Sequence, residues 1–183
     1  MAETPLVIPE RHREIGERFL ELLTQLDARI DAAGDGRVVD YAEVEEQLAS
    51  GFGDLERAAH RACLAALDVD EPSVRIRGRM FKRVGRYPGT YRTLSGPVAV
   101  ERSLYRQVGK RNARTVDAVS LRTGVVGDGW LPRAARAMAY LIAMSPSREA
   151  AATSSELMRL PYSRCSFEPV SYTHLTLPTR YRV

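Results

Sequence analysis

Hydrophobic residues in the first third of the chain recur every three or four positions, which is typical of amphipathic helices. Apolar positions from Ile15 to Ile30 keep this spacing and predict a helix over residues 10–33. A second stripe begins at Val44 and predicts a helix over residues 41–67. Because both helices carry a matching apolar stripe, we expect them to pack against each other as a helical hairpin.

The period changes to two after Pro72, where apolar residues alternate with arginine. Alternation with period two is typical of half-buried β-strands, and clusters of Pro, Gly and Ser mark turns. The pattern therefore predicts a three-stranded antiparallel meander. Its expected strands cover residues 74–84, 90–94 and 98–108, and its expected turns lie at residues 87–89 and 95–97.

Apolar residues return to helical spacing over residues 131–144, which predicts a helix there. Pro132 fits the first turn of this helix, where its missing N–H costs nothing. Ser145 followed by Pro146 predicts the start of another helix that ends near Leu160. Two helices joined by a short turn are similar to a helix-turn-helix unit.

These elements predict an α+β fold with three parts. We expect an acidic helical hairpin over residues 1–70, a basic β-meander over 71–116 and a helix-turn-helix-like part over 117–168. Residues 169–183 resemble the translation of a sequencing-library adapter. We therefore expect this segment to be a non-native tail and exclude it from reasoning about the fold.

Charge is divided sharply along the chain, although the formal net charge is only +4. The first seventy residues hold sixteen acidic residues against seven arginines. From Val74 to Thr115 there are twelve basic residues and a single acid, Glu101. A stretch this positive repels itself, and a polyanion relieves the repulsion while releasing its own counterions. The composition therefore points to nucleic acid as the partner.

The candidate DNA-binding residues are the basic side chains of the meander and of the C-terminal helices. Arginine dominates among them, and its planar guanidinium suits bidentate contacts with phosphate. Period-two spacing places Arg75, Arg77 and Arg79 on one strand face. Tyr87, Tyr91 and Tyr105 lie among these cations and could stack on bases. The full set is Arg75, Arg77, Arg79, Lys82, Arg83, Arg86, Arg92, Arg102, Arg106, Lys110, Arg111, Arg133, Arg136 and Arg148.

Self-neutralisation is the main alternative interpretation of the same charges. The acidic hairpin and the basic meander have opposite net charges, so the arginines could pair with carboxylates of their own chain. The two uses are compatible, since an acidic segment can compete with DNA for one surface.

Catalytic chemistry has little support in the sequence. No P-loop, HExxH, CxxC or GxSxG pattern occurs. Asp117 and Asp128 are the only carboxylates close to the basic stretch on its C-terminal side, and we expect a helix cap and a turn from them rather than a metal site. No apolar stretch is long enough to span a membrane and no secretory signal begins the chain, so we expect a cytoplasmic location.

Several stretches of the expected meander and of the segments after it resemble a known protein family. The stretches Thr90-Tyr91-Arg92-Thr93-Leu94 and Gly96-Pro97-Val98-Ala99-Val100-Glu101-Arg102 resemble a region upstream of the catalytic domain in ISKra-type insertion-sequence transposases. The stretches Trp130-Leu131-Pro132-Arg133 and Ser145-Pro146-Ser147-Arg148-Glu149-Ala150 are similar to the next segment of that family. The residues that fit its first motif are Tyr91, Thr93, Gly96, Pro97, Val98, Val100, Glu101, Arg102 and Tyr105.

The resemblance implies the DNA-binding N-terminal portion of a DDE transposase. Such enzymes hold Mg²⁺ on a carboxylate triad that lies downstream of these motifs, and no residue here matches it. We therefore expect double-stranded DNA as the partner, possible homo-oligomerisation, no membrane and no cofactor in this chain. The rival interpretations are a complete non-catalytic nucleic-acid-binding or regulatory protein, and an interaction module for an acidic partner.

Overall fold

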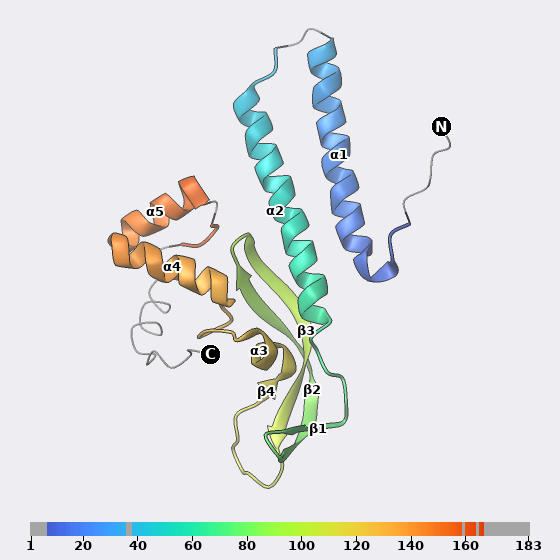
Figure 1. The fold of residues 1–183 in the computed structure, drawn as a ribbon, viewed down its shortest axis with the longest axis vertical. Helices are drawn as coiled ribbons and strands as arrows, with labels where there is room; N and C mark the ends of the chain where they lie inside the picture. The colour runs from blue at the N-terminus through green and yellow to red at the C-terminus, as the bar shows by residue number, and fades with distance from the viewer. Residues whose placement is uncertain (1–6, 36–37, 159, 164, 167–183) are drawn as a thin grey trace. The chain divides into compact units, whose positions relative to one another are not determined.

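The structure is a computed structural model that describes residues 7–35, 38–158, 160–163 and 165–166. It confirms the predicted α+β class, with a long helix pair, an antiparallel sheet and C-terminal helices (Figure 1). The chain forms two compact units, Met1–Ala62 and Cys63–Val183, so the meander and the C-terminal helices belong to one unit. The expected non-native tail over residues 169–183 lies outside the described residues.

The first unit is the helical hairpin that the apolar stripes predict. A short 3-10 turn, η1 (Glu10–His12), leads into α1 (Arg13–Gly34), and the second helix is α2 (Tyr41–Ala65). The Arg29 Nε donates to Gln47 at 3.1 Å, and Arg61 pairs with Glu14, so the helices run antiparallel. Leu22 and Val44 are buried between them, whereas Ile30 stays 59% exposed. Only part of the predicted apolar stripe is therefore covered within this hairpin.

The sheet of the second unit has four strands in the order β1-β2-β3-β4, and each neighbouring pair is antiparallel. The expected strand over residues 74–84 was wrong, because the chain reverses at Arg77 and Gly78. Both residues have positive φ, 48° and 79°, which is the geometry of a two-residue hairpin turn. The strands are β1 (Ser73–Ile76), β2 (Arg79–Thr93), β3 (Gly96–Gln107) and β4 (Val116–Asp117).

The expected turn at residues 87–89 was also wrong, because these residues continue β2. Tyr87 lies opposite Arg102 and Gly89 lies opposite Val100 in the ladder with β3. The reason for a glycine here is space rather than a turn. A Cβ on Gly89 would overlap the guanidinium of Arg102, which lies across the strand at this point.

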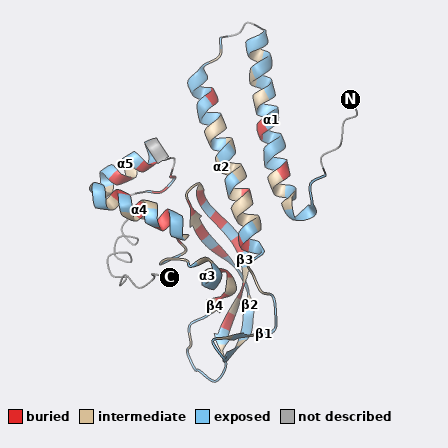
Figure 2. Ribbon diagram, viewed as in Figure 1, coloured by how far each residue is buried: buried red, intermediate tan, exposed pale blue. Residues whose placement is uncertain are grey.

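Two buried clusters stabilise the second unit, and Figure 2 shows their buried positions on β2, β3 and α4. The first joins Leu64, at the end of α2, to the sheet and to α3 (Ala118–Thr123) through Tyr91, Val98, Val100 and Val119. The second lies around the predicted helix pair, α4 (Pro132–Met144) and α5 (Ser147–Met158). Its buried members are Trp130, Ala134, Ala135, Met138, Leu141, Ala150, Leu160 and Tyr162.

Candidate nucleic-acid interface

The linker before the sheet supplies carboxylates to two of the predicted DNA-binding arginines. Arg83 forms an ion pair with Asp70, and Arg86 lies 3.3 Å from Asp70 and 3.6 Å from Asp68. Asp68 also accepts hydrogen bonds from the backbone N–H of Ser103, at 3.0 Å, and from its hydroxyl, at 3.2 Å. The linker is thereby fixed against β3, and both guanidinium groups are already partnered.

Arg102 belongs to a partly buried network that joins β2, β3, β4 and α3. Its guanidinium donates to the Asp117 carboxylate at 2.9 Å and to the Ser120 hydroxyl at 3.3 Å, and it lies 5.6 Å from the ring centre of Tyr91. The Tyr91 hydroxyl donates to the same carboxylate at 3.1 Å. Burial raises the pKa of the Tyr91 hydroxyl above its ordinary value. The Asp117 carboxylate also accepts from the Ser120 N–H at 2.7 Å, which confirms the predicted helix cap.

Arg92, close to the β2–β3 turn, is held by the loop before α4. Its guanidinium donates to the backbone carbonyl of Asp128, lies 3.9 Å from the Asp128 carboxylate and stands 5.4 Å from the Trp130 ring centre. Asp128 lies in a turn, as predicted. Arg83, Arg86, Arg92 and Arg102 therefore have structural partners, and we leave them out of the proposed interface.

The other basic residues of the meander are exposed and gather at one end of the sheet. This end, which we call the basic end, comprises the β1–β2 turn, the adjoining halves of β2 and β3 and the loop before β4, at the bottom of Figure 1. Apart from Arg83 and Arg86, which pair with the linker, none of the described cations in this region forms an ion pair. The eight unpaired cations are Arg75, Arg77, Arg79, Lys82, Arg106, Lys110, Arg111 and Arg114.

The register of the strands decides which of these cations share a face. Lys82 lies directly opposite Arg106, and Arg75 lies opposite Met80 on the neighbouring strand. Directly opposed residues point to the same side of a sheet, and so do residues two apart on one strand. Arg75, Lys82 and Arg106 therefore share one face of the sheet, and each of them is exposed.

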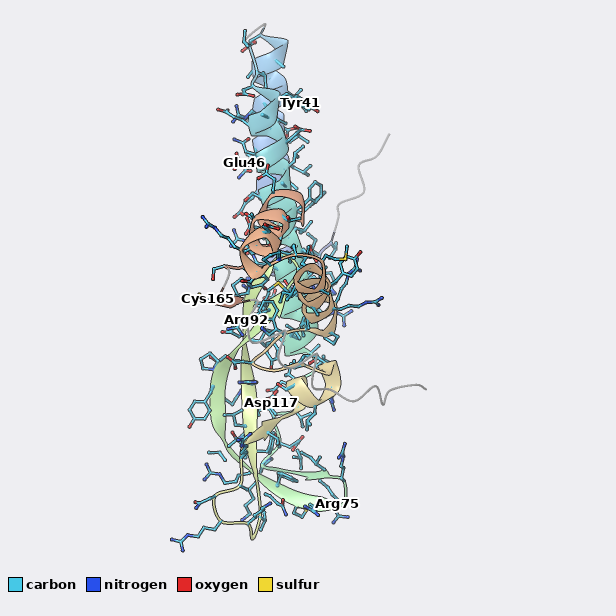
Figure 3. All side chains as sticks on the ribbon, turned by 90° about the vertical axis from the view of Figure 1, so that its left-hand side faces the viewer. Tyr41, Glu46, Arg75, Arg92, Asp117 and Cys165 are labelled. Atoms are coloured by element: carbon cyan, nitrogen blue, oxygen red, sulfur yellow. The ribbon has the colours of Figure 1, made fainter. Side chains whose placement is uncertain are left out.

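The predicted common face of Arg75, Arg77 and Arg79 was wrong. Arg77 occupies the turn, and Arg79 lies opposite Ile76, so Arg79 points to the other side of the sheet from Arg75. All three side chains nevertheless surround the same turn and are exposed. In Figure 3, Arg75 lies at the far end of the sheet from Arg92, with Asp117 between them.

The predicted stacking role fails for two of the three tyrosines. Tyr91 and Tyr105 are each 1% exposed, and the Tyr105 hydroxyl is bonded to backbone groups of Val69 and Glu71. Tyr87 is 49% exposed and stays available. The two buried tyrosines hold the sheet to α3 and to the linker rather than contacting a partner.

The remaining predicted residues lie in other parts of the second unit. Lys110 and Arg111 belong to the loop before β4, within the basic end. Arg133 and Arg136 are exposed on α4, and Arg148 is exposed on α5. Across the described residues, no group of three His, Cys, Asp or Glu side chains could hold a metal ion.

Sequence reasoning missed how Asp68 and Asp70 act. They were counted with the acidic hairpin, but they follow α2 and pair with the sheet. The available signal was their position directly before the first strand, where a linker must return along the sheet.

Comparisons of this chain with protein families, with curated proteins and with solved structures return no match. Within the part of the chain that the structure describes, no helix is both long and apolar enough to cross a membrane.

Proposed function

We propose that the basic end of the sheet binds the phosphate backbone of double-stranded DNA, as the DNA-positioning portion of an insertion-sequence transposase of the ISKra type. The observation that carries the proposal is the set of eight exposed cations without an ion-pair partner among the described residues. The segments that form this end contain no acidic residue over 72–100 or over 102–116.

The arrangement of these cations is unfavourable unless an anion is present. Lys82 and Arg106 lie directly opposite each other in neighbouring strands, and like charges in that position destabilise a sheet. Folding therefore holds together charges that repel each other. Phosphate groups relieve this repulsion, and counterion release from DNA adds a favourable term.

The transposase assignment is supported by the motif resemblance. Several residues of the shared motif form the turn and the core of the β2–β3 hairpin that carries the basic end. The Thr93 hydroxyl donates to the carbonyl of Gly96 at 2.8 Å, Gly96 has φ of 122°, and Val98 and Val100 are buried. The motif thus describes a scaffold, and the cations beyond it supply the proposed contacts.

The test is titration of a fluorescently labelled duplex with the full chain at several salt concentrations. With six or more phosphate contacts, affinity should fall by about 10³-fold between 50 and 200 mM salt. Replacing Lys82, Arg106, Lys110 and Arg111 by Gln should weaken binding to all duplexes alike and lower the slope of log K against log salt by about 3 to 4.

The matched control replaces four arginines of the helical hairpin, Arg11, Arg13, Arg18 and Arg29, by Gln. It changes the net charge by the same amount, so equal losses in the two variants would overturn the assignment to the basic end. A third variant that replaces Arg133, Arg136 and Arg148 measures the contribution of the C-terminal helices. A flat salt response of the wild-type chain would instead favour the interaction module for an acidic protein.

A further inference from the structure

Two exposed apolar side chains lie in the middle of the basic end. The Val108 N–H donates to the carbonyl of Met80 at 3.0 Å, directly beyond the paired residues Phe81 and Gln107, so Met80 and Val108 oppose each other across the two strands. Met80 is 42% exposed and Val108 is 49% exposed. The pair therefore presents a small apolar surface to solvent at the end of the β2–β3 ladder.

The strand register surrounds this apolar pair with charge on the same face. Arg75 on β1 lies opposite Met80. Lys82 is two residues from Met80 on β2, and Arg106 is two residues from Val108 on the neighbouring strand. Side chains two apart on a strand share a face, so these three cations and the apolar pair point in one direction. If the cations hold the phosphate backbones of a duplex, the groove between the two backbones lies over Met80 and Val108.

We propose that Met80 and Val108 form a wedge that enters the minor groove of the bound duplex, opens a base step and bends the DNA. This inference rests on the proposed function and adds to it that the target is deformed. Proteins that bend DNA from the minor groove use apolar wedges of this kind, including methionine, between contacts to phosphate. Steps that unstack easily, such as TA, are the expected insertion sites.

Membrane binding is the other use of an apolar pair within cations, and the structure favours DNA. Peripheral membrane binding needs a large apolar face that enters the lipid, as on an amphipathic helix. Here Met80 and Val108 form a small apolar pair among exposed cations rather than such a face. Their small area fits a single opened base step.

The test measures bending by energy transfer between dyes at the two ends of a short duplex with a central TA step. The variant carries Met80→Gln and Val108→Thr, which preserve side-chain size and every charge. Wild-type chain should raise the transfer efficiency on binding, whereas the variant should leave it near the value of free DNA. Its affinity should fall by about tenfold, because the burial of a few apolar groups is lost. Its salt slope should not change, because the phosphate contacts remain.

The matched control carries Met144→Gln and Val38→Thr, two exposed apolar positions outside the sheet that are 69% and 101% exposed. This control should bend DNA as the wild type does. Wild-type binding without any change in transfer, or equal bending by the Met80 and Val108 variant, would overturn the wedge while leaving the proposed function intact. Absence of duplex binding would overturn the proposed function itself. Binding to anionic vesicles that depends on the apolar pair, without DNA bending, would assign the pair to a membrane instead.

Discussion

Two regions of one sheet use arginine in opposite ways. In the middle of the sheet, Arg102 lies between the Asp117 carboxylate, 2.9 Å away, and the Tyr91 ring, and it takes part in holding the sheet to α3. At the basic end, Lys82 and Arg106 oppose each other with no carboxylate near them in sequence. The same basic side chains thus stabilise the fold in the middle of the sheet and are left for a partner at the basic end.

The difference lies in where the acidic residues fall, since basic residues are common along the whole sheet. Each ion-paired arginine of the sheet has an aspartate partner from another segment: Asp68 and Asp70 from the linker before β1, Asp117 from the end of β4, and Asp128 from the loop before α4. The β1–β2 turn and the loop before β4 bring none. Counting every arginine therefore overestimates the size of the proposed interface. The cations that have no ion-pair partner among the described residues define it better.

Removal of the Asp117 carboxylate is the strongest test of this contrast. We expect Asp117→Ala to lower the free energy of unfolding by about 2–3 kcal/mol, because it leaves the half-buried Arg102 guanidinium unpaired and removes the cap of α3. Urea unfolding followed by circular dichroism measures the loss. DNA affinity should be unchanged wherever the variant is folded, since the basic end is intact.

Asp128→Ala is the matched control for that substitution. The Asp128 side chain is 99% exposed and its carboxylate lies 3.9 Å from Arg92, so its removal should change stability little. A loss as large as that of Asp117→Ala would show that the two aspartates do not differ as described. The contrast would also fail if Asp117→Ala weakened DNA binding without unfolding the chain.

Much of the fold could be predicted from spacing alone, because helical and strand periods report local burial directly. The helix pair and the helix that begins at Pro132 followed from it, and so did a β2–β3 hairpin turn, although this turn lies at residues 94–95 rather than at the expected 95–97. The break within 74–84 did not, because an arginine, Arg77, holds positive φ beside Gly78. Alternation of apolar and basic residues continued across this turn and hid it.

The basic character of the site could be predicted from the sequence, but which basic residues belong to it could not. Whether an arginine is free depends on contacts across many residues, such as Arg102 with Asp117 or Arg83 with Asp70. These contacts follow from the register of the strands and from the path of the linker. Nothing in the local sequence of Arg83 distinguishes it from Lys82, its exposed neighbour.

Removal of the Tyr91 hydroxyl should have a smaller effect. Tyr91→Phe keeps the buried ring but loses the hydrogen bond to Asp117 at 3.1 Å, so we expect a loss of about 1 kcal/mol. Burial raises the pKa of this hydroxyl above the ordinary 10.0, so above pH 10 the unfolded chain loses this proton while the folded chain keeps it. This group's contribution to stability is complete below pH 10 and declines as the pH rises beyond it.

The measurement is the free energy of unfolding of both proteins at pH 7 and at several values above pH 10. The difference between wild type and Tyr91→Phe should narrow as the pH rises, because only the wild type carries this ionisation. A constant difference would mean that the hydroxyl titrates in the folded chain as it does in the unfolded chain. Tyr87→Phe is the control, since Tyr87 is 49% exposed.

The smallest expected effect is a gain in stability at the basic end. Lys82→Glu places a carboxylate opposite Arg106 and replaces a repulsive cross-strand pair with an attractive one, so we expect a gain of about 0.5 kcal/mol at low salt. The same substitution should weaken duplex binding, because it removes one cation that contacts phosphate and introduces a carboxylate that repels phosphate. Thermal unfolding and duplex titration on one preparation measure both effects. Stability and DNA affinity should therefore move in opposite directions here, whereas Asp117→Ala in the middle of the sheet changes stability alone. A Lys82→Glu chain that lost stability would show that Lys82 already has a stabilising partner.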